Sequence, residues 1–374
     1  MNDAGESPVV YGSVSRIGIQ GSRFVGKDGT GRPVADLPVP APDHTAACEY
    51  VLSWMLSRKD VGMPDAVGHR IVHGGSRYAA PEEVSAELVA SLEKLITYAP
   101  GHMPQALQAV DHVRKVFPGT FQVACFDTAF HRSMPDVAQL YSLPESVRKK
   151  GVQRFGFHGL SCEYLMHELK QKQGNDTGRA ILAHLGHGAS MTAVRDGKSI
   201  DTTMGFSPSG GMVMGTRTGD LDPGVILFLL QQEGMSPENI EDMVNRRSGM
   251  VGISGTSGDM RDLLKAEKEE SAAHEAVELF CYQARKHIGS LAAVLGGLDV
   301  LVFTGGIGEH SPEIRERICS GLEFLGITID EEKNRKNMPV VSQEKGPVAV
   351  RIIGTNEEVM IARHTYRVLE SSQQ

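Results

Sequence analysis

The hydrophobic and polar positions of the chain predict strands and helices that alternate along most of its length. Short apolar runs predict strands at 9–14, 66–72, 122–126, 180–185, 299–304 and 348–353. Apolar residues at helical spacing predict helices at 46–56, 84–98, 105–116, 223–233, 237–246, 260–267, 273–295 and 356–369. The segment 25–42 is rich in Gly, Pro and Asp, which predicts turns and hairpin edges. Alternating strands and helices indicate an α/β fold.

Two glycine-rich turns in this pattern suit a phosphate group. The strand 180–185 turns at Gly186-His187-Gly188 and returns through 190–194 and 198–202, which predicts a β-meander whose turn offers backbone N–H groups. Residues 305–308 form a predicted loop between the strand 299–304 and a helix capped at Ser311-Pro312-Glu313, a position that favours an anion or nucleotide. Neither turn has the P-loop or the dinucleotide-binding pattern, and ordinary turns also carry such glycines.

Composition and charge restrict the class of protein. The chain has 374 residues, more than one hydrophobic core usually spans, so two domains are expected. Hydrophobic residues make up 40% and charged residues 22%, which excludes a disordered or fibrous chain. The net charge of -8 argues against a nucleic-acid or anionic-membrane partner, because phosphates need a basic surface.

The cysteines and the apolar runs predict a cytoplasmic location. The five cysteines are odd in number and never in C-x-x-C spacing, which favours a reducing compartment over a disulfide scaffold or a zinc site. Apolar runs such as 225–230 are too short to span a bilayer, and residues 1–6 lack the features of a signal peptide.

Several charged and polar residues stand at predicted strand ends and turns. Arg70 lies inside an apolar strand, where a buried guanidinium must be paired, and Asp127 ends another strand. His158 and Arg217 lie in glycine-rich turns. One interpretation is a structural Arg–Asp pair that holds two domains together. The other is an anion clamp, in which two arginines and a histidine surround a transferring phosphoryl group while Asp127 and a second acid hold Mg²⁺.

A set of motifs makes this pattern specific. They are HRIVHGG (69–75), FDTAFH (126–131), GFHG (156–159), HLGHGAS (184–190), MGFSPSGG (204–211), MGTRTGDLDPG (214–224), GISGTSGDMRDL (252–263), FTGGIGEHSPEIRERI (303–318) and TNEE (355–358). Together, and in this order, they resemble the acetate kinase family over nearly the whole chain from Val10. That family belongs to the actin-like ATPases. The resemblance implies two actin-like (ribonuclease H-like) domains with a cleft between them, one formed by 1–128 with 359–374 and the other by 129–358.

The resemblance also implies an activity. Family members transfer the γ-phosphoryl group of ATP to acetate, reversibly and in line, giving acetyl phosphate and ADP. They need Mg²⁺, with Mn²⁺ as a possible substitute, and they are homodimers. The expected partners are therefore acetate, ATP and a second copy of the chain. Two alternatives stay open: a kinase for propionate or another short carboxylate, and a catalytically impaired nucleotide-binding homologue.

Site roles follow from the matching positions. The resemblance implies that Arg70 and Arg217 bind the carboxylate and stabilise the transition state, with His158 at the transferring group and His102 in support. Glu357, and Asp127 through water, would hold Mg²⁺. The acetate contacts would be Arg70, Val72, Phe157 and Pro208. The nucleotide contacts would be His184, Gly186, His187, Gly188, Asp259, Met260, Arg261, Gly305, Gly306, Ile307 and Gly308. A structural role is expected for His69, His73 and His131.

Four departures from the family pattern matter. The usual opening, N-[SA]-G-S-S-S-L-K, has no counterpart, so we expect the first strand pair and first phosphate loop to be missing, through a misassigned start or a truncated, impaired protein. The first is favoured because the other catalytic residues are present. His187 replaces an Asn of the phosphate turn. Gly101 replaces a Leu beside the acetate methyl group, which predicts that propionate is accepted well. Met260 replaces an aromatic residue expected against adenine, which predicts weaker stacking.

Overall fold

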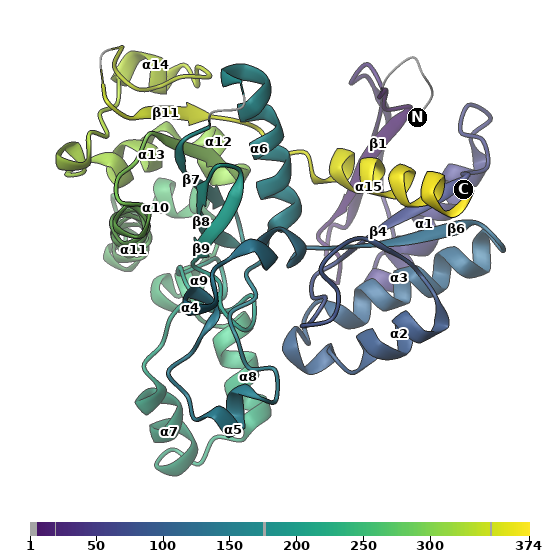
Figure 1. Cartoon of the computed structure of the whole chain (residues 1–374), viewed down its shortest axis with the longest axis horizontal. Helices are drawn as coiled ribbons and strands as arrows, with labels where there is room; N and C mark the ends of the chain where they lie inside the picture. The colour runs from purple at the N-terminus through teal and green to yellow at the C-terminus, as the bar shows by residue number, and fades with distance from the viewer. Residues whose placement is uncertain (1–5, 19, 175–176, 345) are drawn as a thin grey trace. The chain divides into compact units, whose positions relative to one another are not determined.

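The computed structural model describes residues 6–18, 20–174, 177–344 and 346–374. It divides into two compact units, coloured from purple to blue with a yellow last helix, and from teal to yellow-green, in Figure 1. Unit 1 comprises Met1–Gly74, Ala80–Phe126 and Ile361–Gln374, and unit 2 comprises Gly75–Ala79 and Asp127–Met360.

Unit 1 begins with an antiparallel sheet in the order β1-β2-β3, formed by β1 (Val10–Ser15), β2 (Arg23–Asp28) and β3 (Pro33–Pro38). The segment expected to hold hairpin edges is thus a regular hairpin. Helix α1 (His44–Ser57) covers this sheet, and the Phe24 ring packs edge-on against Trp54 at a centroid distance of 4.8 Å. Asp43 caps the helix, because its side chain accepts the Ala46 N–H.

The second sheet of unit 1 has the order β4-β6-β5. Strands β4 (Ala66–Ile71) and β6 (Phe121–Phe126) are parallel, and β5 (Glu82–Glu83) pairs with β6 in the antiparallel sense. The other elements are α2 (Ala86–Glu93), η1 (Ile96–Tyr98), α3 (Met103–Val116) and the last part of α15 (Glu357–Ser372). At Gly68 a Cβ would lie 2.3 Å from Thr365 Oγ1, so only glycine lets α15 approach β4 this closely.

Unit 2 is built on a five-stranded sheet in the order β11-β10-β7-β8-β9. Its strands are β7 (Arg179–Leu185), β8 (Ala189–Arg195), β9 (Lys198–Thr202), β10 (Val300–Thr304) and β11 (Ala349–Ile352). The antiparallel run β7-β8-β9 confirms the predicted meander, while β10 runs parallel to both β7 and β11. Helices α6 (Gly159–Gln173) and α11 (Ser271–Leu295) lie on opposite sides of the sheet in Figure 1.

The core of unit 2 follows from strand alternation. Leu182, Val194 and Val302 lie on one face and pack against Leu165 and Leu169 of α6. The remaining elements of the unit are short: η2 (Ala129–Ser133), α4 (Asp136–Gln139), α5 (Glu145–Arg148), α7 (Pro223–Gln231), α8 (Pro237–Arg246), α9 (Gly249–Ser254), α10 (Met260–Ala266), α12 (Gly305–His310), α13 (Pro312–Cys319), η3 (Glu323–Leu325) and α14 (Glu331–Arg335). Within the described ranges, no helix combines the length and the apolar character needed to cross a membrane.

Three local predictions were wrong. Residues 305–308 are not a loop, because α12 starts at Gly305 directly after β10. Ser311 occupies the N-cap position of α13, but its side chain makes no capping hydrogen bond. Arg70 is exposed, since it alternates with buried His69 and Ile71 along β4, so the cost expected for a buried guanidinium does not arise.

Candidate active site

The two glycine motifs of unit 2 lie beside each other. Gly186–Gly188 joins β7 to β8, and the Gly186 N–H donates to the Gly188 carbonyl at 3.0 Å. A Cβ at Gly186 would lie 3.9 Å from the backbone nitrogen of Gly306. Strands β7 and β10 are hydrogen-bonded neighbours. The turn Gly186–Gly188 that follows β7 therefore lies beside the start of α12, which follows β10.

The start of α12 depends on Gly305. Its φ is +76°, and a Cβ there would lie 2.7 Å from the Leu185 carbonyl oxygen, so no larger residue fits. The Gly305 N–H donates to Glu309 Oε1 at 2.9 Å, and this amide is thus bonded within the protein. A Cβ at exposed Gly306 would meet no atom within 4 Å, which leaves room for a ligand at that residue.

Two histidines stack next to the turn Gly186–Gly188. The rings of His158 and His184 lie 4.2 Å apart between centroids and 19° from parallel. Each Nδ1 meets a serine hydroxyl at 2.9 Å, Ser190 for His158 and Ser161 for His184. His158 has φ of +57° and precedes α6, a left-handed conformation that non-glycine residues rarely adopt. The backbone thereby directs a buried imidazole toward the glycine turn.

Arg217 and His158 converge on Gly188. A Cβ at Gly188 would lie 2.6 Å from Arg217 Nη2 and 3.4 Å from His158 Nε2. Arg217 is held by a 2.8 Å hydrogen bond from its Nη1 to the carbonyl of Pro208, a buried residue. A guanidinium and an imidazole that meet at one point suit an anion, because their N–H groups and positive charge can stabilise phosphoryl oxygens.

The residue that replaces Asn in the turn, His187, packs against glycine. A Cβ at Gly215 would lie 2.5 Å from the His187 ring. Burial and the Arg217 guanidinium lower the pKa of His187, against a smaller opposing effect of Asp259. The imidazole is therefore neutral at pH 7 and adds no positive charge to the turn.

The expected adenosine contacts lie at the start of α10. Asp259 caps this helix and pairs with Arg261, whose Nη2 lies 2.6 Å from Asp259 Oδ2. The Arg261 side chain is 84% exposed and can leave this pair at low cost. Met260 is buried. Its contact with adenine stays a prediction.

The two acids expected to hold a metal lie near one thiol. Burial raises the pKa of Cys162 to about 12, and the charges of Glu357 and Asp127 add to this effect. Asp127 is buried, and its carbonyl accepts the Gly159 N–H at 2.8 Å. Two carboxylates fit Mg²⁺, which keeps several waters and takes its other ligands from phosphates. Among the residues with described positions, no cluster of three or more His, Cys, Asp or Glu forms a complete metal cage.

Three of the predicted site residues belong to unit 1. Arg70 and His102 are exposed on β4 and just before α3, and Val72 is buried after β4. Exposed Gly101 has no atom within 4 Å of a Cβ placed on it. The two acetate contacts predicted in unit 2, Phe157 and Pro208, are both buried.

Contacts of the other motif histidines are structural. His69 Nε2 lies 2.8 Å from Gln122 Oε1, and fully buried His73 packs edge-on against Tyr98. His131 bonds the Phe157 carbonyl at 2.9 Å, and burial lowers the pKa of His131 to about 4. His131 thus holds in place the segment that ends at His158.

Sequence reasoning missed the hydroxyl and carboxyl groups behind the site. These are Ser161, Ser190, Glu309 and Thr355, which bond the stacked histidines and the start of α12. All four lie inside or directly beside the motifs already singled out, so proximity to those motifs was the available signal.

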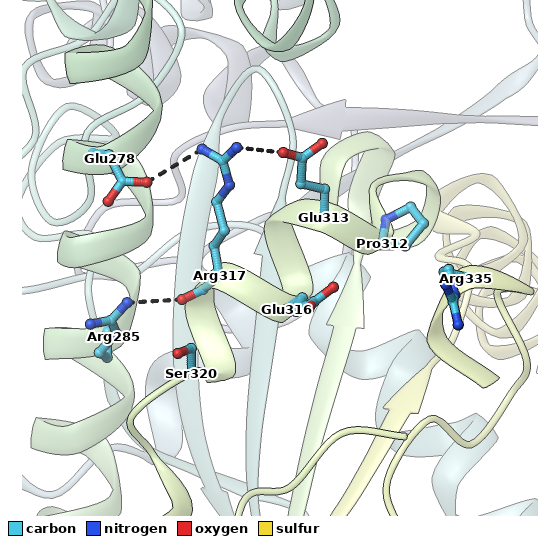
Figure 2. Close-up of a pocket in the computed structure, with 8 residues that line it drawn as sticks. All are labelled: Glu278, Arg285, Pro312, Glu313, Glu316, Arg317, Ser320 and Arg335. Atoms are coloured by element: carbon cyan, nitrogen blue, oxygen red, sulfur yellow. Dashed lines mark hydrogen bonds and ion pairs between the residues drawn. The ribbon is translucent and has the colours of Figure 1, made fainter. Parts of the chain in front are cut away.

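A separate pocket of about 710 Å³ lies among α11, α13 and α14 (Figure 2). Its lining is charged, but Arg317 in its wall already bonds Glu278 and Glu313, as the dashed lines show. Arg285 donates to the Arg317 carbonyl at 2.9 Å. These groups join helices to one another, and none was predicted as a site residue.

Comparison with known proteins gives a consistent picture over almost the whole chain. The Acetokinase family matches residues 1–363. An acetate kinase from Methylocella silvestris is 43% identical over 369 residues, which cover 97% of this chain and 91% of that protein. The crystal structure of Porphyromonas gingivalis acetate kinase has a TM-score of 0.83 at 39% identity, and that of a propionate kinase from Francisella tularensis has 0.89 at 34%. Each covers 96% of this chain and 93% of its own.

Proposed function

This chain belongs to the acetokinase family, and from that premise we propose that it transfers the γ-phosphoryl group of ATP to acetate, reversibly, giving acetyl phosphate and ADP. Its α/β fold is that of the actin-like ATPases, as predicted. The observation that carries the proposal is the convergence of Arg217 and His158 on Gly188, beside the start of α12.

The proposed chemistry needs few groups from the protein. An acetate oxygen forms a bond to the γ-phosphorus while the bond from that phosphorus to the β–γ bridging oxygen breaks, and ADP leaves. Acetate is already ionised at neutral pH, so the step needs neither a general base nor a protein nucleophile. The enzyme must position the reactants and stabilise charge on the equatorial oxygens, which suits Arg217 and the Nε2 of His158.

Family membership implies ATP as co-substrate and a divalent metal ion. We propose Mg²⁺, with Mn²⁺ as a substitute, held by Glu357 and, through water, by Asp127. When bound, such an ion neutralises phosphate charge. The remaining substrate roles are proposed on the family pattern: Arg70 and His102 at the carboxylate, Val72, Phe157 and Pro208 at the methyl group.

We further propose that the chain acts as a homodimer in the cytoplasm, where ATP is available. Helix α7 supports the dimer, because it is almost wholly apolar and buries none of its residues. Leu227 and Phe228 are each 52% exposed. A second copy of the chain would remove this surface from water.

Propionate is the second candidate acceptor. The open space at Gly101 favours it, because nothing within 4 Å of a Cβ there would exclude one more methylene group. The alternative of a catalytically impaired homologue predicts a folded protein without turnover.

Substitution of Arg217 tests the proposed role of the convergent groups. Arg217→Ala should lower kcat for acetyl phosphate formation by about 100- to 1,000-fold, the usual cost of losing one preorganised donor to a developing charge. Arg246→Ala, an exposed arginine of α8 that pairs with Asp242, is the matched control and should leave kcat unchanged. Retention of wild-type activity in Arg217→Ala would contradict the assignment.

A further inference from the structure

A line of hydrogen bonds leads from His184 into the protein. His184 Nδ1 lies 2.9 Å from Ser161 Oγ, and Thr355 Oγ1 donates to the same serine oxygen at 2.8 Å. The serine hydroxyl therefore receives one hydrogen bond and has one proton left to donate. His184 Nδ1 is the acceptor in reach, which makes Nδ1 the unprotonated nitrogen of the ring.

The other nitrogen of the same ring faces the phosphate turn. A Cβ at Gly186 would lie 3.9 Å from His184 Nε2, on the side of the turn next to Gly306. If Nδ1 accepts a hydrogen bond from the Ser161 hydroxyl, then in the neutral imidazole the ring proton is on Nε2. The line of hydroxyls thus presents an N–H donor, and not a lone pair, to an anion held at the turn.

Thr355 also connects this line to the start of α12. Its backbone N–H donates to Glu309 Oε1 at 3.3 Å. The same carboxylate oxygen accepts from Gly305 N at 2.9 Å and Thr304 Oγ1 at 3.2 Å. One residue therefore joins the stacked histidines, through its hydroxyl, to the helix start that adjoins the phosphate turn, through its amide.

We propose that Ser161 and Thr355 are positioning residues that hold His184 in its Nε2–H form, so that it donates a hydrogen bond to the transferring phosphoryl group. The claim that His184 donates to the phosphoryl group rests on the proposed function. The claim that Ser161 and Thr355 hold His184 in its Nε2–H form does not.

The tautomer can be observed directly in the whole protein. Long-range ¹H–¹⁵N spectra of the ¹⁵N-histidine-labelled chain distinguish a protonated from a bare ring nitrogen, and His184→Gln identifies the His184 signals. We expect wild-type His184 to be protonated at Nε2 and bare at Nδ1. In Ser161→Ala and in Thr355→Val the two forms should mix, and Thr355→Ser should restore the wild-type pattern.

Kinetics provide the second measurement. Ser161→Ala and Thr355→Val should lower kcat for acetyl phosphate formation by about 10- to 100-fold, as loss of an outer hydrogen-bond partner typically does, with the KM for ATP little changed. Thr355→Ser should again behave as wild type. Thr202→Val is the matched control: it removes a buried hydroxyl that bonds Thr192 and the Met191 carbonyl, and it should change neither spectrum nor kcat.

Each outcome decides one of two claims. A wild-type His184 protonated at Nδ1, or an unchanged His184 spectrum in both Ser161→Ala and Thr355→Val, overturns the positioning role. If Ser161→Ala and Thr355→Val have the same kcat as the wild type, the claim that His184 donates to the phosphoryl group is overturned. A wild-type protein that forms no acetyl phosphate contradicts the proposed function instead. The spectra would still show which ring nitrogen of His184 is protonated.

Discussion

Gly188 illustrates how single residues define the site. A side chain there would take the space in which Arg217 Nη2 and His158 Nε2 meet, so any substitution must displace the two groups that we propose bind the anion. Gly101 has the opposite surroundings. It is exposed and open, and the size of a side chain added there should affect only the choice of acceptor.

The acceptor prediction belongs to this position. We expect the kcat/KM for propionate to be comparable with that for acetate, and Gly101→Leu to lower the propionate value relative to acetate. One methylene in such a pocket is worth about 1–3 kcal/mol, or about 10- to 200-fold. Steady-state kinetics with both acids measure the ratio. Gly62→Leu is the control, since Gly62 is also exposed and open. A propionate to acetate ratio far below unity in the wild type would contradict the account.

Residue patterns predict part of the site but not the residues that hydrogen-bond its histidines. The glycines of 186–188 and 305–308 were identified because strands 180–185 and 299–304 could be recognised from their apolar runs. The Ser161–Thr355 bond could not be predicted, because the two residues are 194 positions apart and neither interrupts a periodic pattern. The apolar run 66–72 predicts a buried strand and with it a buried Arg70, whereas alternation along β4 places Arg70 on the exposed side.

At the scale of elements, one arginine joins three helices of unit 2. Arg317 of α13 bonds Glu267, which follows α10, at 2.7 and 2.8 Å, and it also bonds Glu278 of α11 at 3.3 Å. The Glu267 side chain is only 7% exposed, so it has little access to water. Figure 2 shows the Arg317 side chain directed at Glu278 and Glu313 in the wall of the pocket.

Removing this arginine should loosen the helix layer. Arg317→Ala should lower the free energy of unfolding by about 1.5–3 kcal/mol, the range for hydrogen bonds to charged groups. Lys336→Ala, which breaks an exposed pair with Glu332, should cost less than about 1 kcal/mol. Urea unfolding followed by circular dichroism measures both. Equal effects of the two substitutions would contradict the buried role of Arg317.

The pair of Arg317 and Glu267 also predicts a pH dependence of the stability. Arg317 holds the pKa of Glu267 below its usual range. A carboxyl with a lowered pKa in the folded state contributes stability above its unfolded pKa and loses that contribution as pH falls through the folded value. The difference between wild type and Arg317→Ala should therefore be full at pH 7 and shrink below about pH 4.

Apolar residues at helical spacing predict most of the longer helices, including α3 and α11, which no side chain caps. Helix α8, at Pro237–Arg246, matches its predicted range because Ser236 caps it and Pro237 opens it. The predicted helix 84–98 instead ends at Glu93 and resumes as the short η1. Helix α6 was missed, since its N-cap is His158 in a left-handed conformation, which offers no usual start signal.

At the scale of the whole molecule, α7 makes the dimer testable. Leu227→Glu and Phe228→Glu should each convert a dimer into a monomer at micromolar concentration, because a charge would be buried in an apolar contact. Light scattering coupled to size exclusion measures the mass. Phe324→Glu is the control, because Phe324 is 78% exposed on η3, away from α7 in the sequence. A monomeric wild type, or variants that stay dimeric, would contradict the role of α7.

The central claim is that this chain phosphorylates acetate, and one measurement tests it most directly. The purified protein is incubated with Mg²⁺-ATP and acetate, and acetyl phosphate is trapped with hydroxylamine as the coloured hydroxamate. The account predicts acetate-dependent product, formed together with ADP in equal amounts and abolished when EDTA removes the metal. A folded protein that hydrolyses ATP without forming hydroxamate, or that forms none at all, would contradict it.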